Sequence, residues 1–436
     1  MFFDQLSRPK NILFTLLTMA VIVHLGASLA LSPVVEAQFL DADEQEYYRL
    51  AGNLLHGEYE FQSRRTLGFV LILALFRLVT QDNLIATQLL TTTLFSLVGP
   101  LMYILVRRIT GHNLLAVTVA VFVIFWPPFL FYGSSLYSET AALPLFITLL
   151  ILLPRGSILT RNSDGGWRRC IFAGVLMGLC IHIRPMYLLF TPLTVVILFL
   201  EEHNWRIVLR RSVLLAIGCC LVVLPWSVYI SVQEGIPFLI SSNGGETISG
   251  GLNPVLVEQD YKIVIAPDGR ETWVGPGKWL TESQSGYLSQ DELKLPYAQR
   301  DKLLKERTIA WVINNPLSAL HLQTAKLLYM WGFYPFWQGA KQTLFGNLPT
   351  VILLGLSSIS LIRFRCYLRH LSRFWILPVF VSVVALISWG SWRFRQPGDL
   401  GLLMFGSLFL WSMFVKPKRL MPLYMDRIST KSFTES

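Results

Sequence analysis

The chain has 436 residues, of which 53% are hydrophobic and only 15% are charged. Soluble domains carry about 25% charged residues, so this composition excludes an ordinary soluble protein. Apolar runs of about 20 residues, the length that crosses a bilayer, recur along the sequence. Together these features predict an all-α, polytopic protein in a lipid bilayer. The formal net charge of +10 indicates no nucleic-acid partner, because Lys and Arg gather at the ends of the apolar runs, where they orient membrane helices.

About ten membrane-spanning helices are predicted, and the basic residues set their direction. The first run, 12–32, is longer than the apolar core of a signal peptide, which is about 7–15 residues, so we expect an uncleaved helix whose N-terminus lies in the cytoplasm. The other predicted spans are 84–106, 113–131, 140–154, 170–183, 186–200, 212–232, 346–362, 374–390 and 398–415. This topology places the short basic loops, including the cluster at 363–373, on the cytoplasmic side, as the positive-inside rule requires.

Two further apolar stretches are expected to lie at the outer interface of the membrane instead of crossing it. Leu67–Val79 is too short for a span and contains Arg77. Leu317–Phe336 is long enough, but counting it as a span would move the basic cluster at 363–373 to the outer side. We therefore predict two interfacial helices on the outer face.

The polar region 233–315 is rich in Gly, Asn and Ser and contains several turn signals. It predicts a small lid on the outer face, with a helix at Gln299–Val312. Three parts of the chain follow: an N-terminal transmembrane catalytic module at 1–232 with a first outer loop at 33–83, a lid with its interfacial helix at 233–345, and the last membrane helices with a cytoplasmic tail at 346–436.

The first outer loop carries the strongest indication of chemistry. Asp41, Asp43, Glu44 and Glu46 lie within six residues, directly after the first membrane helix. Acids near a helix start can be caps, but that role explains one or two of the four, and charge beside a membrane is costly without a partner or a role. A carboxylate can accept the proton of an attacking hydroxyl or amine. We interpret Asp43, and after it Asp41 and Glu44, as catalytic candidates; the cluster is compatible with a divalent cation but requires no cofactor.

Arginines at predicted helix ends on the outer side could bind a phosphate. Guanidinium groups form paired hydrogen bonds to phosphate oxygens, although they can also extend to lipid head groups or pair with the acids. The candidates are Arg64, Arg65, Arg184, Arg393 and Arg395.

Glu139 follows Ser138 at the start of a predicted helix, so both helix capping and substrate binding remain open for it. No Cys or His spacing supports a zinc site, and no Gly-rich phosphate loop follows a strand. A nucleotide-sugar site of the Rossmann type is therefore unsupported.

Several motifs in chain order have a familiar pattern. They are the acidic motif before Tyr47-x-x-Leu50-Ala51-x-Asn53-Leu54-Leu55-x-Gly57-x-Tyr59, Arg65 with Gly68-Phe69, Tyr132 through Ser138-Glu139, Arg184-Pro185, Leu224-Pro225-Trp226, Ser242-Asn243-Gly244-Gly245 with Asn253-Pro254, Asn315-Pro316, and Arg393-Phe394-Arg395-x-Pro397. This order resembles the C-type (GT-C) integral membrane glycosyltransferases, specifically bacterial members of glycosyltransferase family 39. That family includes protein O-mannosyltransferases and lipid A aminoarabinose transferases.

The resemblance implies a GT-C bundle, a sugar donor linked to polyprenyl phosphate, and an active site on the periplasmic face of the inner membrane. Asp43 would be the general base, and the five arginines would bind the donor phosphate. We expect further substrate contacts from Glu139, Tyr137, Asn243 and Asn253. The acceptor would be an envelope lipid, glycan or protein, and transfer would invert the sugar carbon.

A lipid or sugar transporter, or flippase, is the alternative function. A transporter would be expected to carry acids and broken helices near the middle of the membrane, whereas these acids follow the first helix in an outer loop. A third alternative is a membrane partner protein without catalysis.

Overall fold

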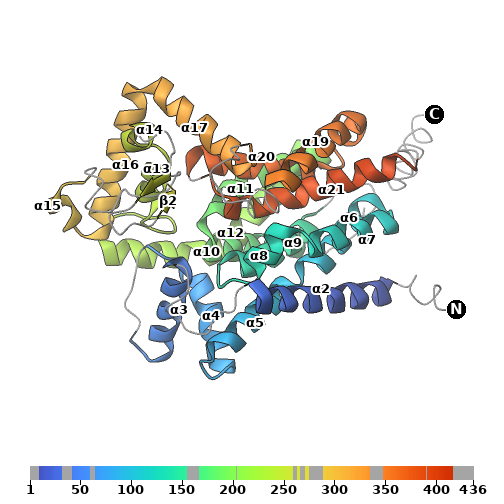
Figure 1. The fold of residues 1–436 in the computed structure, drawn as a ribbon, viewed down its shortest axis with the longest axis horizontal. Helices are drawn as coiled ribbons and strands as arrows, with labels where there is room; N and C mark the ends of the chain where they lie inside the picture. The colour runs from blue at the N-terminus through green and yellow to red at the C-terminus, as the bar shows by residue number, and fades with distance from the viewer. Residues whose placement is uncertain are drawn as a thin grey trace.

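The computed structural model describes residues 9–31, 42–58, 64–154, 166–202, 204–258, 263–265, 271–273, 288–333, 347–388 and 390–415. These residues form a bundle of helices with a smaller helical group at one end (Figure 1). The start of α2 (Pro9–Leu31) and the end of α21 (Gln396–Ser412) lie at the opposite end of the bundle from that group. The predicted all-α membrane architecture is confirmed.

The other elements of the bundle follow in chain order. They are α5 (Leu84–Phe95), α6 (Val98–Thr110), α7 (Asn113–Ile124), α8 (Pro127–Gly133), α9 (Glu139–Leu152), α10 (Gly166–Ile183), η3 (Pro185–Leu189), α11 (Phe190–Glu201), α12 (Trp205–Glu234), α19 (Leu348–Arg363), η6 (Arg365–Tyr367), α20 (Ser372–Ile387) and η7 (Trp392–Arg395).

The elements outside the bundle surround its charged end. They are α3 (Ala42–Leu55), α4 (Leu67–Val79), α13 (Gly244–Gly251), α14 (Pro254–Glu258), β1 (Ile263–Ile265), β2 (Glu271–Trp273), α15 (Gln290–Leu293), α16 (Tyr297–Asn314) and α17 (Pro316–Met330). The two strands form a short antiparallel pair in which Val264 lies opposite Thr272. The helices expected at 67–79, 299–312 and 317–336 correspond to α4, α16 and α17.

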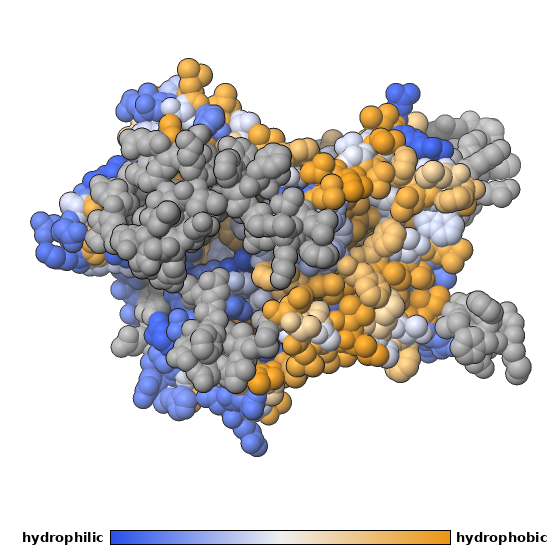
Figure 2. Space-filling model, in the orientation of Figure 1, coloured by the Kyte–Doolittle hydropathy of each residue, from blue (hydrophilic) through white to orange (hydrophobic). Residues whose placement is uncertain are grey.

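Each predicted span coincides with a helix or helix pair, but fewer have the full length for a bilayer. In the described part of the chain, four helices are long and apolar enough to cross a membrane: α2, Leu84–Thr110, α10 and α12. There is a fifth span if α7 and α8, which are bent by 55°, are counted as one. Apolar side chains cover the visible face of the bundle, and hydrophilic residues gather at the end that carries α3 and α15 (Figure 2). The protein is therefore a multi-pass membrane protein, and the number of ten spans stays a prediction.

Glycines let α10 and α12 approach closely. A Cβ atom on Gly174 would lie 2.1 Å from the carbonyl oxygen of Leu215, and one on Gly218 would lie 2.1 Å from that of Ile171. Small residues at such crossings let membrane helices pack through their backbones, which gives dispersion contacts that lipid cannot replace. Because Arg184 directly follows α10, this packing also fixes where that arginine lies.

Arg373 stabilises the end of the bundle opposite Arg184. It was predicted within the cytoplasmic basic cluster, but its side chain has no exposed surface and pairs with Glu201 at 2.6 Å. Its guanidinium also donates to the carbonyl oxygens of Leu150, Leu153 and Pro154 at the end of α9. Carbonyls at a helix end lack partners within the helix, so Arg373 satisfies them and joins α9, α11 and α20.

Arg77 explains why a charged residue interrupts the apolar α4. Its side chain is buried and forms an ion pair with Asp82 at 2.5 Å, while it donates to the backbone oxygen of Tyr48 in α3. A Cβ atom on Gly52 would lie 2.5 Å from the Arg77 guanidinium, so a larger residue at that position of α3 would displace this group. This contact holds α3, and with it Asp43, against α4.

The α10–α12 packing predicts that Gly218→Ala destabilises the fold. The added methyl group would meet the Ile171 carbonyl, a backbone atom that cannot rotate away, and overpacking of this kind costs about 1–3 kcal/mol. Thermal unfolding of the purified protein in detergent should show a lower midpoint. Gly355→Ala in α19 is the matched control, because no heavy atom lies within 4 Å of its added Cβ. Equal midpoints for the two variants would contradict the proposed packing.

Candidate functional site

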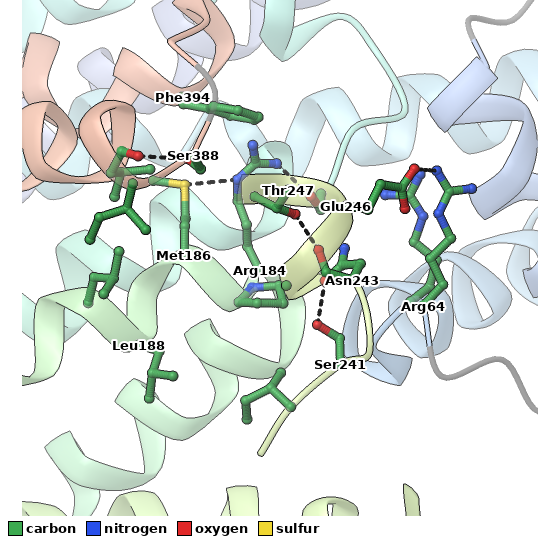
Figure 3. Close-up of a pocket in the computed structure, with 18 of the residues that line it drawn as sticks. Arg64, Arg184, Met186, Leu188, Ser241, Asn243, Glu246, Thr247, Ser388 and Phe394 are labelled. Atoms are coloured by element: carbon green, nitrogen blue, oxygen red, sulfur yellow. Dashed lines mark hydrogen bonds and ion pairs between the residues drawn. The ribbon is translucent and has the colours of Figure 1, made fainter. Parts of the chain in front are cut away.

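A cavity of about 390 Å³ lies where α3, η3, α13 and η7 meet. One wall is charged and includes Asp43, Arg64, Arg65, Arg184, Arg393 and Glu246. The other wall is apolar and includes Met186, Leu188, Leu189, Val384, Ile387 and Phe394. Figure 3 shows Arg184 between Met186 and the ring of Phe394, with Arg64 beside Glu246. The cavity therefore presents charged and lipid-like surfaces to the same volume.

Asp43 stands in the first turn of α3, where the helix dipole favours an acid. Its two carboxylate oxygens bind Arg65 Nη2 and Arg393 Nη1, each at 2.5 Å. Burial alone would raise the pKa of Asp43, but the neighbouring guanidinium groups of Arg393 and Arg65 lower it below its ordinary range. The side chain is 34% exposed, so this anionic carboxylate remains accessible.

Glu46 binds the same arginine as Asp43. Arg65 Nε donates to Glu46 at 2.8 Å, and the ring of Tyr47 lies 5.0 Å from the guanidinium. Residues three apart share one face of a helix, so the spacing of Asp43 and Glu46 in α3 points both carboxylates toward Arg65.

Glu139 begins α9 and links two arginines from distant parts of the chain. Its carboxylate pairs with Arg184 at 2.5 Å and accepts hydrogen bonds from Nε and Nη2 of Arg393. Ser138 makes no capping hydrogen bond with its side chain; its hydroxyl accepts from Arg184 at 3.0 Å and donates to Glu139 at 3.1 Å. Glu139 lies behind the cavity wall as the shared counter-ion of Arg184 and Arg393, not among the residues that line the cavity.

The ring of Tyr137 packs against the guanidinium of Arg393. The guanidinium carbon lies 3.8 Å from the centre of the Tyr137 ring, and the tyrosine is buried. A cation stacked on an aromatic face gains about 0.5–2 kcal/mol, depending on how far it is desolvated. Tyr137 thus orients an arginine and is not itself part of the cavity lining.

Besides Glu139 and Tyr137, three more candidates from the sequence lie outside the cavity. Arg395 is fully buried and pairs with Asp399 at 2.8 Å, because its side chain leaves the short helix η7 in a different direction from that of Arg393. Glu44 is buried and accepts a hydrogen bond from the Leu136 backbone at 2.6 Å, which ties α3 to the segment before α9. Asn253 accepts from Leu256 N at 3.0 Å and so caps α14. Asp41 lies outside the described residues.

The lid contributes residues that the sequence did not single out. Glu246 in α13 pairs with Arg64 at 3.0 Å and accepts a hydrogen bond from the Tyr297 hydroxyl. Asp301 of α16 accepts from the backbone N–H of Gly245 and of Glu246 at 2.9 and 2.7 Å, so it caps α13. Glu246 follows the motif that contains Asn243, which does line the cavity. Its partner Arg64 is 182 residues away, and no local pattern indicates such a pair.

A second cavity of about 650 Å³ lies on the other side of the same arginines. It shares Asp43, Arg64 and Arg65 with the first cavity, and its remaining lining residues are Gln45, Glu46, Tyr48 and Arg49. Asp43 therefore stands between a cavity with an apolar wall and one lined by polar and charged side chains.

Within the described ranges, no group of three or more His, Cys, Asp or Glu side chains is arranged to hold a metal ion.

This fold is that of the GT-C membrane glycosyltransferases. A structure of the oligosaccharyltransferase AglB of Archaeoglobus fulgidus, in complex with an inhibitory peptide and a dolichol-phosphate, aligns with a TM-score of 0.53 and 14% identity over 95% of this chain and 52% of that chain. A structure of the oligosaccharyltransferase of the same organism, tethered to an acceptor peptide, aligns with a TM-score of 0.52 and 12% identity over 94% and 50%. The chain spans about half the length of these solved proteins.

Residues 72–238 match the family model described as dolichyl-phosphate-mannose-protein mannosyltransferase (PMT). The match runs from α4 to the segment after α12 and includes Glu139 and Arg184. No curated protein sequence matches the chain. The resemblance predicted from the sequence motifs is confirmed by the family match and by the fold.

The placement of the two late arginines predicts that removing Arg395 destabilises the protein more than removing Arg393. Arg395→Gln should destabilise the protein by about 3–5 kcal/mol, because it leaves Asp399 buried without its counter-charge. Arg393→Gln should cost less, since Glu139 keeps its ion pair with Arg184. Thermal unfolding in detergent measures both, and Arg395→Gln combined with Asp399→Asn should recover part of the loss. A stable Arg395→Gln protein beside an unfolded Arg393→Gln protein would reverse the assignment.

Proposed function

We propose that this protein is a glycosyltransferase that moves a sugar from a polyprenyl-phosphate donor to an acceptor on the periplasmic face of the inner membrane. The observation that carries the proposal is the first cavity, where one carboxylate, several guanidinium groups and an apolar wall face the same volume. A polyprenyl-phosphate sugar has the complementary parts: a sugar carbon open to attack, an anionic phosphate and an isoprenoid chain.

The donor fits the side of the cavity formed by η3, α20 and η7. Met186, Leu188 and Ile387 offer an apolar surface beside the bundle, and Arg184 and Arg393 offer cations next to it. The PMT family is named for dolichyl-phosphate-mannose, and the solved AglB complex contains a dolichol-phosphate, which supports a lipid-phosphate donor. Arg64 and Arg65 lie farther along the charged wall, where they would meet the phosphate or the sugar.

The proposed reaction is a single displacement at C1 of the sugar. Asp43 accepts the proton of an acceptor hydroxyl or amine, and the acceptor oxygen or nitrogen forms the new bond to C1. The bond between C1 and the phosphate oxygen breaks, and its electron pair leaves with the polyprenyl phosphate. Arg393 and Arg184 stabilise the charge that develops on that phosphate. Attack opposite the leaving group inverts the configuration at C1.

We propose that the acceptor enters through the second cavity. Its lining is polar and charged, and the exposed Arg49 adds a cation at its edge. Asp43 borders both cavities. A general base needs this position if it takes a proton from the acceptor while the acceptor attacks the donor. Envelope lipids, glycans and proteins all carry a hydroxyl or amine suited to this position. Because Arg65 binds both Asp43 and Glu46, we assign no step to a metal ion.

We propose the three-part division at 232 and 345, with a lid in 233–345. The contact between Arg64 and Glu246 supports the lid, because it joins the loop before α4 to α13, and residues of α13 line the cavity. The chain after Val415, where we propose a cytoplasmic tail, lies outside the described residues.

Asp43→Asn should abolish sugar transfer without affecting membrane insertion. Loss of a general base typically lowers the rate about 10²–10⁴-fold. The test compares envelope lipids, glycans and proteins by mass spectrometry from a deletion strain that carries the wild type, Asp43→Asn or an empty vector. Asp291→Asn, a change of the same type at a side chain that is 94% exposed, should behave like the wild type. A glycan profile with Asp43→Asn that equals that of the wild type would refute the catalytic role. If the protein were a flippase, Asp43→Asn would instead impair lipid translocation.

Arg49→Gln should weaken binding of the acceptor more than binding of the donor. Arg49 lines only the second of the two cavities described above, so its loss should raise KM for the acceptor several-fold and leave KM for the donor and kcat nearly unchanged. The assay uses the acceptor fraction that the mass-spectrometric comparison identifies. Arg184→Gln, which alters the first cavity, should instead raise KM for the donor and lower kcat, because Arg184 is assigned to the leaving phosphate. A shift in donor KM with Arg49→Gln would exchange the two cavity assignments.

A further inference from the structure

The charged wall of the site is balanced by its own side chains. Four arginines face four carboxylates in and directly behind the first cavity. They are Arg64, Arg65, Arg184 and Arg393 on one side, and Asp43, Glu46, Glu139 and Glu246 on the other. A phosphate that binds here therefore meets guanidinium groups that already have carboxylate partners.

Glu139 cannot easily give up its arginines. It is only 4% exposed, and its oxygens bind Arg184, Arg393 and the hydroxyl of Ser138. Removing the partners of a buried charge is strongly unfavourable, because no water replaces them. Glu139 therefore keeps the Arg393 guanidinium in place from behind, and the Tyr137 ring supports its face.

Asp43 is the carboxylate that can leave Arg393 most easily. Its side chain is 34% exposed and touches Arg393 only through Nη1, while its other oxygen keeps Arg65. Water can replace one lost contact at such an exposure. Arg393 lines the cavity, and the donor lipid would lie along its apolar residues. Carboxylate and phosphate oxygens accept the same charge-assisted hydrogen bonds from a guanidinium.

We propose that the Asp43 carboxylate and the donor phosphate compete for Nη1 of Arg393, so that donor binding releases Asp43 to act on the acceptor. This inference rests on the proposed glycosyltransferase function. Its consequence is an ordered reaction in which the donor binds before the base becomes active.

The electrostatics of Asp43 agree with this order. Burial favours its neutral form, but Arg393 and Arg65 hold its pKa below the ordinary range, so in this arrangement it is a weak base. When the phosphate takes Arg393, one opposing charge is neutralised and a like charge arrives. Both changes raise the pKa of Asp43, and its affinity for the acceptor proton increases.

The test measures binding of polyprenyl monophosphate, the leaving group of the proposed reaction, to the full chain in phosphatidylcholine nanodiscs. Asp43→Asn should bind it roughly tenfold more tightly than the wild type, because a neutral amide competes poorly for a guanidinium. Glu46→Gln removes the same charge from the same face of α3 but does not touch Arg393, so it should change the affinity by less than about threefold. Asp43→Ser gives a second neutral side chain should Asn fold poorly, and the unfolding midpoint of each variant is measured in the same nanodiscs.

A double-mutant cycle isolates the contact itself. In an Arg393→Gln background, Asp43→Asn should no longer tighten binding, because the contested donor is absent. Equal or weaker binding by Asp43→Asn in the native background would overturn the competition and leave the proposed function intact. Failure of the wild type to bind polyprenyl monophosphate would overturn the proposed function as well, so the two failures are distinguishable.

Discussion

Glu139 lies where the segment after α8, the end of α10 and the turn of η7 converge. Its carboxylate binds Arg184 and Arg393, which are 209 residues apart in number and are held together only by this shared counter-ion and their packing. With little water near it, the ionised carboxylate is stabilised by these two guanidinium groups. The positions of the two arginines, the cavity between them and the reach of Arg393 to Asp43 all depend on this contact.

The rest of the molecule fixes the parts that this network joins. Backbone packing of α10 on α12 through Gly174 and Gly218 places Arg184, and the Arg77 contact between α4 and α3 places Asp43. At the other end of the bundle, Arg373 and Glu201 join α20 to α11 and α9. Charged side chains inside an apolar bundle thus act as cross-links, because each has its partner at a fixed depth.

The site is also a boundary between two environments. The apolar side of the first cavity is built from η3 and α20, which belong to the membrane bundle, whereas the second cavity is lined by side chains of α3 and of the segment before α4. A reaction between a lipid-linked donor and a water-exposed acceptor needs such a boundary, with its base accessible from both sides. The lid residue Glu246 then determines how Arg64, at the rim, is oriented.

The sequence by itself determined the helices and much of the chemistry. Apolar runs bounded by Arg and Lys located the bundle helices, the run at 67–79 is α4, and Asp43 of the acidic motif lines one cavity with Arg65, Arg184 and Arg393. These features are local: hydrophobic length, charge at helix ends and residue type are visible within a few positions. The lid helix α16 was visible for the same reason, since it ends just before Pro316.

Only the tertiary structure decided which charged side chains face the cavity. Arg393 and Arg395 are two residues apart, yet one faces Asp43 and the other is buried against Asp399, because their side chains leave η7 in different directions. Glu44 and Asn253 look like site residues in a motif but satisfy backbone groups, and Glu246 finds its partner 182 residues away. Side-chain direction and long-range pairing depend on how whole helices pack, and no local spacing in the chain encodes them.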